Sequence, residues 1–150
     1  MFNIGNINRK TEMFLFDIFI AINKIKYVVK DFDNSDDLLH SFKDWDTVIR
    51  EFEIIGEASK YLLKNNLLDN EFRKIVDFRN RITHNYFGID PEIVFHISKY
   101  ELDDFLKVIN KLINKIDNSL KNELIESFIE DNKYLDFIVK ELKKLNKGDI

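Results

Sequence analysis

Apolar side chains recur every three or four residues along most of this chain, and this periodicity restricts the possible fold more than any other feature. The segment after Asp90 shows it clearly, with apolar positions at Val94, Ile97 or Ser98, Leu102, Phe105, Ile109, Leu112 and Ile116. This spacing is that of one face of an α-helix, whereas a half-buried strand alternates every second residue. One Pro and four Gly in 150 residues leave few helix breakers. We therefore expect an all-α protein.

Five helical segments can be predicted, and the signals at their ends set the boundaries. The polar cluster "DFDNSDD" is expected to end the first helix, and "DPE" begins the fourth with a cap residue and a proline. The polar "EDNKY" weakens the middle of the last helix and favours a break there. The expected segments are about Arg9 to Lys30, Trp45 to Asn65, Asn70 to Gly88, Asp90 to Asp117 and Leu120 to Leu145.

Four such helices joined by short connections predict an antiparallel four-helix up-and-down bundle, to which the C-terminal helix is an addition. The apolar content of 45%, with 14 Phe, is enough for one core, so residues 1–150 are expected to form a single domain. Gly56 lies inside the second helix, where glycine costs about 1 kcal/mol relative to alanine. We interpret it as a point where another helix approaches closely.

Composition excludes several classes of function. The chain has no Cys, which removes disulfides, thiolate metal sites and cysteine nucleophiles. His40 and His96 have no partners at a convincing metal-ligand spacing, so we expect neither a metal nor a cofactor. The N-terminal "MFNIGNINRK" does not resemble a signal peptide, and "MFLFDIFIAI" is well short of the roughly 20 apolar residues that a bilayer requires. A cytoplasmic protein with no membrane segment is expected.

The stretch "RNRITHNY", residues 79–86, does not fit a plain bundle. Arg79 follows Phe72 by seven residues and Val76 by three, so it occupies a position where the apolar stripe calls for an apolar side chain. A guanidinium is rarely buried without a partner, because its desolvation is costly. Its charge can be met by an internal carboxylate, such as Glu57 or Asp77, or by an anion in a cleft or at an oligomer interface.

On a helix, Asn80 and His84 share one face, while Arg79, Thr83 and Tyr86 line the neighbouring face. Arginine carries a fork of donors that suits phosphate, and histidine has the side-chain pKa nearest neutrality. The pattern therefore suits cleavage of a phosphodiester. A buried salt bridge, a histidine that caps the helix, and core aromatics at a turn are alternatives that the spacing leaves open.

With its flanks, this motif resembles the HEPN-domain family, specifically the HepT-like ribonuclease toxins, whose signature is Arg, four residues, His, one residue, Tyr. "FRNRITHNYFGID" is similar to that signature, and "VIREFEIIGEASKYL" is similar to the family's preceding helix with its Gly-Glu-Ala element. The resemblance covers about residues 9–117. The C-terminal helix, about residues 118–150, departs from it and is expected to pack on the bundle, on a second subunit or on an antitoxin.

The resemblance implies a homodimer in which the motifs of both subunits form a composite site for RNA. Members of this type are metal-independent endoribonucleases and the toxins of type II toxin-antitoxin systems. By this resemblance, Arg79 would bind the scissile phosphate, His84 would be the acid or base, and Asn80 would orient the site. Tyr86 matches the tyrosine to which a minimal nucleotidyltransferase antitoxin transfers AMP.

Two other functions stay open at this stage. One is a HEPN module that binds nucleotide or a nucleotidyltransferase partner without cleaving RNA, and the other is a helical dimerisation domain. Arg81, although it lies within the motif, is left out of the expected catalytic set because no position of the family signature matches it.

Overall fold

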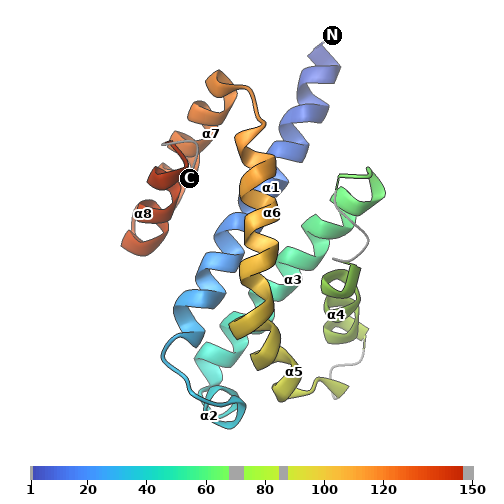
Figure 1. Cartoon of the computed structure of the whole chain (residues 1–150), viewed down its shortest axis with the longest axis vertical. Helices are drawn as coiled ribbons and strands as arrows, with labels where there is room; N and C mark the ends of the chain where they lie inside the picture. The colour runs from blue at the N-terminus through green and yellow to red at the C-terminus, as the bar shows by residue number, and fades with distance from the viewer. Residues whose placement is uncertain (1, 68–72, 85–87, 147–150) are drawn as a thin grey trace.

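The computed structural model is a bundle of helices joined by turns (Figure 1). It describes residues 2–67, 73–84 and 88–146, and for residues 2–9, 74, 78 and 81–84 the description is limited to the backbone. Within these ranges, the predicted all-α bundle with a C-terminal helical addition is confirmed. Its four segments are α1 (Phe2–Val29), α3 (Phe42–Lys64), α4 (Arg73–His84) and a composite segment formed by α5 (Pro91–His96), η3 (Ile97–Glu101) and α6 (Leu102–Asn114).

The first helix, α1, lies at the centre of the molecule, because α3, α6 and the C-terminal α8 (Asp136–Leu145) all pack against it. Its apolar residues therefore face several neighbours rather than one. Those of its side chains that are at most 5% exposed include Leu15, Phe16, Ile18, Phe19, Ala21, Ile22, Ile25 and Val29. A helix that is apolar on most of its surface is expected to be buried in this way.

The fourth segment contains a π-helical turn, η3, that the sequence pattern did not predict. Ile97 and Leu102 are both buried although five residues separate them, which is more than one α-helical turn. The i→i+5 hydrogen bonding of a π-helix takes up the extra residue and keeps both side chains in the core. The start of the segment is as predicted, because the Asp90 Oδ1 accepts a 2.9 Å hydrogen bond from the Glu92 backbone N–H.

The polar cluster that was expected only to end the first helix also forms a short helix, α2 (Ser35–Leu39). Asn34 caps it, accepting a 2.9 Å hydrogen bond from the Asp37 backbone N–H. Leu38 is fully buried, and the Ser35 hydroxyl donates to Glu92 of α5 at 2.9 Å. This contact fastens the α1–α3 connection to the beginning of the fourth segment.

The C-terminal helix is broken in two, as the weak "EDNKY" segment indicated, into α7 (Asn118–Asp131) and α8. Both helices pack on the bundle. The rings of Phe128 on α7 and Phe16 on α1 stack with centroids 5.1 Å apart, and Ile138 and Leu142 of α8 are fully buried. Of the surroundings expected for this extension, the bundle itself is therefore the one observed.

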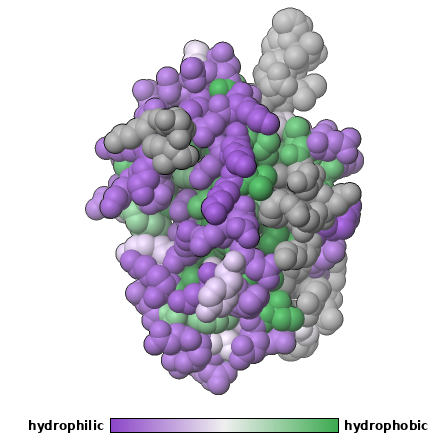
Figure 2. Space-filling view, viewed as in Figure 1, coloured by the Kyte–Doolittle hydropathy of each residue, from purple (hydrophilic) through white to green (hydrophobic). Residues whose placement is uncertain are grey.

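Figure 1 shows α4 beside α3 on one flank of the molecule and α7 and α8 on the opposite flank. The face drawn in Figure 2 is covered mainly by hydrophilic side chains, in keeping with an apolar core inside the bundle. None of the helices in the described ranges combines the length and the apolar character needed to cross a bilayer. The site of interest lies at the flank that carries α4.

Candidate active site between α1, α3 and α4

The helix that carries the motif, α4, is packed on α3, and Gly56 lies at the contact. Gly56 is buried, and a Cβ atom placed on it would overlap the Cβ and Cγ atoms of Arg79. Ile75 and Val76, one turn earlier on α4, are 2% and 4% exposed and anchor the helix on the core. The close helix approach predicted from Gly56 is thus confirmed, and the residue that approaches is Arg79.

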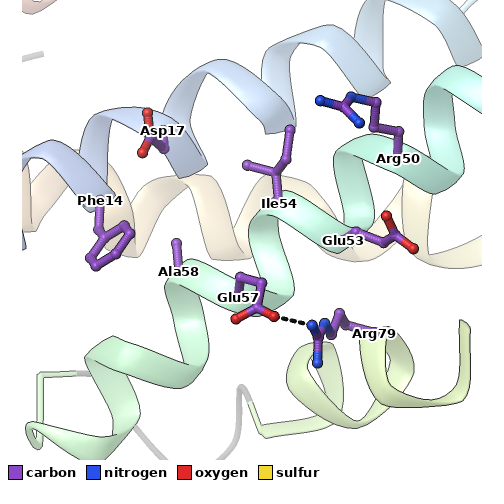
Figure 3. A pocket seen from close by; sticks show the side chains of 8 residues that line it. All are labelled: Phe14, Asp17, Arg50, Glu53, Ile54, Glu57, Ala58 and Arg79. Carbon is purple, nitrogen blue, oxygen red and sulfur yellow. Dashed lines mark hydrogen bonds and ion pairs between the residues drawn. The ribbon is translucent and has the colours of Figure 1, made fainter. Parts of the chain in front are cut away.

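The Arg79 side chain is 16% exposed, and described residues hold it by two polar contacts, of which Figure 3 shows the one with Glu57. Its Nη2 forms an ion pair with the Glu57 carboxylate, and its Nη1 donates a 3.1 Å hydrogen bond to the Asn80 side-chain oxygen. The Nε atom is buried and has no hydrogen-bond partner among the described residues. Of the two carboxylates considered from the sequence, Glu57 is therefore the one that pairs with the arginine.

A pocket of about 450 Å³ lies beside this ion pair. Its residues come from three helices, as Figure 3 shows: two from α1, five from α3 and one from α4. Phe14, Ile54 and Ala58 supply apolar surface, and the charged side chains lie around them. The lining residues are Phe14, Asp17, Arg50, Glu53, Ile54, Glu57, Ala58 and Arg79.

The pocket is not uniformly basic, because its three carboxylates outnumber its two guanidinium groups. Burial raises the pKa of Asp17 above its ordinary value. Burial also raises the pKa of Glu51, on the adjacent part of α3, while Lys24 and Arg50 oppose that shift. Strong attraction of a polyanion to this surface by net charge alone is therefore not expected, and recognition depends on the placement of individual groups.

The motif residues divide between described and undescribed parts of the chain. Arg79 and Asn80 are brought into contact, as noted above. His84 is the last residue of α4, roughly 7–8 Å along the helix axis from Arg79, and only its backbone is described. Tyr86 lies outside the described residues. The roles expected for these four residues stay predictions.

Sequence reasoning missed the contribution of α1 to the site. Phe14 and Asp17 are more than 60 positions before the motif, and no local spacing connects them to it. The available signal was the single Asp within the apolar run "MFLFDIFIAI". Because charged residues are rarely buried without a partner, an acidic residue in such a run indicates that this face of the helix borders a polar or solvent-accessible site.

The histidines other than His84 lie at the surface. His40 Nδ1 is 2.8 Å from the Asp36 carbonyl oxygen, and His96 Nε2 is 3.5 Å from a Glu101 carboxylate oxygen. Within the described ranges, no three His, Cys, Asp or Glu side chains gather in a way that would hold a metal ion.

Comparison with known proteins shows the family to which the chain belongs. A family profile described as "Ribonuclease HepT-like" matches residues 18–112, which extend from α1 into α6 and stop before α7. The chain therefore belongs to the HepT-like family of HEPN proteins. The C-terminal helices α7 and α8 lie beyond the matched region.

Two archaeal relatives illustrate the similarity. "Putative RNase MJ1380" of Methanocaldococcus jannaschii is 33% identical over 106 residues, which cover 67% of this chain and 94% of the relative. "Probable ribonuclease HepT" of Thermococcus cleftensis is 31% identical over 97 residues, covering 63% of this chain and 87% of the relative. No solved structure matches this chain.

Proposed function

We propose that this protein is an endoribonuclease that cleaves RNA by attack of a 2′-hydroxyl on the adjacent phosphate. Membership of the HepT-like family and the ribonuclease names of its relatives support the activity. One observation supports the assignment of this activity to a site: Arg79, the arginine of the motif, forms an ion pair with Glu57 and lines a pocket.

The 2′-hydroxyl is already tethered beside the phosphorus atom, so a metal is not needed to bring in the nucleophile. In the proposed reaction His84 either accepts the 2′-hydroxyl proton or protonates the leaving 5′-oxygen, and water takes part in the other proton transfer. Arg79 stabilises the negative charge that develops on the phosphate oxygens. Asn80 orients the guanidinium through its hydrogen bond. The bond from phosphorus to the 5′-oxygen breaks, which leaves a 2′,3′-cyclic phosphate and a 5′-hydroxyl.

We further propose that the active form is a homodimer whose two motifs line one composite cleft. The position of α4 supports this arrangement, because it lies at a flank of the bundle where a second copy can pack against it (Figure 1). Two Arg79 side chains would then converge on one phosphate-binding cleft. Residues 1–150 act as one domain in this scheme, with α7 and α8 completing the core.

The same proposal includes regulation by a partner. The protein is the toxin of a cytoplasmic type II toxin-antitoxin pair, and a minimal nucleotidyltransferase antitoxin transfers AMP to Tyr86. An added AMP carries negative charge and bulk two residues from His84, which would obstruct RNA. Intact-peptide mass after co-expression with a neighbouring nucleotidyltransferase gene tests this step, with Tyr86→Phe as control. Absence of the AMP mass on the Tyr86 peptide would contradict it.

An RNA-cleavage assay tests the activity itself. Wild-type protein should cleave RNA in the presence of EDTA, whereas Arg79→Ala and His84→Ala should be inactive. The ends of the products, identified by mass, should be a 2′,3′-cyclic phosphate and a 5′-hydroxyl. Equal activity in all three proteins would refute the site, and loss of wild-type activity in EDTA would refute the metal-independent mechanism.

A non-catalytic HEPN module that binds nucleotide or a partner is the second candidate. The ion pair of Arg79 with Glu57 favours it, because a partly buried arginine that serves structure alone would have such a partner. This candidate predicts that the wild type binds RNA or nucleotide but leaves the RNA intact under all conditions of the assay.

A further inference from the structure

We infer that Glu57 is a positioning residue for Arg79: its carboxylate fixes the guanidinium so that the remaining donors can receive one phosphate. The inference rests on the proposed ribonuclease function and adds a residue outside the motif to its site. Glu57 belongs to α3, 22 residues before Arg79, and directly follows Gly56, against which the Arg79 side chain packs closely.

The donors of the guanidinium can be assigned one by one. A guanidinium has five N–H groups, one on Nε and two on each terminal nitrogen. The Nε group is buried, one Nη2 hydrogen is directed to Glu57, and one Nη1 hydrogen is directed to Asn80. Within the described part of the chain, one N–H on each terminal nitrogen has no partner. Two N–H groups on adjacent nitrogens match the two oxygens of a phosphate in a bidentate contact.

The stem of Arg79 is constrained as well as its end. Its Cβ and Cγ atoms lie against Gly56, where no side chain separates the two helices. The tip is then set by one carboxylate from α3 and one amide oxygen from α4 itself. Among the described residues, Glu57 makes the one polar contact between the guanidinium and another helix, so Glu57 aligns Arg79 with the pocket between α1 and α3.

The exposure of Glu57 argues against a purely structural role for this ion pair. The Glu57 side chain is 58% exposed, and ion pairs with exposed partners contribute little to stability. Removal of the Glu57 charge should therefore leave the protein folded. It should nevertheless slow the reaction, because misplacement of a catalytic group by about 1 Å can cost on the order of 100-fold in rate.

The carboxylate also has an opposing effect, since it repels the RNA phosphate that Arg79 would bind. Glu57→Gln keeps the shape and removes the charge. We therefore expect a fall in kcat of roughly 10- to 100-fold with a KM that is unchanged or lower. A structural role would lower the melting temperature and the amount of active protein, and would not separate kcat from KM in this way.

The experiment compares wild type, Glu57→Gln, Glu57→Asp and Arg79→Ala in RNA cleavage, with melting temperatures for all. Glu57→Asp restores the carboxylate one methylene shorter and should recover part of the lost kcat. Glu130→Gln is the matched control: it removes an exposed carboxylate of α7 that pairs with Lys133, just beyond that helix, at 2.8 Å.

The outcomes separate the inference from the function on which it rests. A wild-type protein that leaves RNA intact overturns the proposed function. A wild type that cleaves, with Arg79→Ala inactive and Glu57→Gln as fast as wild type or faster, overturns the positioning role alone. If Glu57→Gln melts early, Glu57→Asp decides. A stable Glu57→Asp with a kcat above that of Glu57→Gln supports positioning, and one with the kcat of Glu57→Gln overturns it.

Discussion

Replacement of Gly56 by alanine is the most informative single change, because two effects of known size oppose each other there. In the middle of an isolated helix, alanine is favoured over glycine by about 1 kcal/mol. In this structure the new Cβ would overlap the Cβ and Cγ atoms of Arg79, whereas ordinary contacts lie at 3.4–4 Å. Those atoms are near the backbone of α4, so the arginine cannot swing aside and the helix must move.

Overpacking of a close contact costs roughly 1–3 kcal/mol. After the helix-propensity gain of about 1 kcal/mol, we expect a net loss of about 0–2 kcal/mol in the free energy of unfolding. Displacement of α4 also moves Arg79 away from the pocket and from Glu57. RNA cleavage should therefore fall by more than the loss of folded protein explains.

Urea unfolding followed by circular dichroism measures the stability, and RNA cleavage at a temperature where the variant is fully folded measures the function. Lys60→Ala, an exposed position one turn further along α3, is the control and should differ little from wild type. A Gly56→Ala protein that is more stable than wild type by about 1 kcal/mol, with full activity, would refute the close packing of α4 on α3.

Three further changes test other parts of the structure. Ile138→Ala removes a fully buried side chain of α8 and should lower the free energy of unfolding by about 2–5 kcal/mol, measured with urea; a negligible loss would mean that α8 is not part of the core. Asp17→Asn should raise the melting temperature at pH 7, because burial raises the pKa of Asp17 and the folded state disfavours its charge. That gain should shrink as pH falls through the folded pKa and vanish below the ordinary value of 3.8; a gain independent of pH would exclude this cause. Asp90→Ala removes the cap of α5 and should cost about 0.5–2 kcal/mol in thermal unfolding, and an unchanged melting temperature would show that Pro91 alone starts the helix.

Local patterns predicted the helices well because their causes are local. The apolar spacing located the four bundle segments, and the Asp90 and Pro91 signal placed the start of α5 at the observed residue. The weak segment in the C-terminal helix predicted the break between α7 and α8. The departures, α2 and the π-turn η3, both depend on packing partners, since Ser35 bonds to α5 and Leu102 turns toward the core.

In the candidate site, too, features with local causes could be predicted, and features that depend on packing could not. Its four motif residues could be named from spacing and from a family resemblance, because they lie within eight consecutive positions of the sequence. The partner of Arg79 could not be chosen, since Glu57 and Asp77 were equally admissible on sequence grounds. The pocket residue Phe14 could not be found by a local pattern, and Asp17 stood out only as a lone acidic residue in an apolar run, with nothing to connect it to Arg79.

The amino-acid sequence by itself determined that this protein is a helical bundle of the HepT-like type with a polar motif near the end of one helix. Periodicity, capping residues and motif spacing are properties of neighbouring positions, so they can be read from a short stretch of sequence without knowledge of the fold. Only the tertiary structure decided that Arg79 packs against Gly56 and that Glu57 forms the ion pair with Arg79. It also decided that α1 contributes residues to the pocket beside this ion pair. Those contacts join residues far apart along the chain, so they arise only when the helices pack.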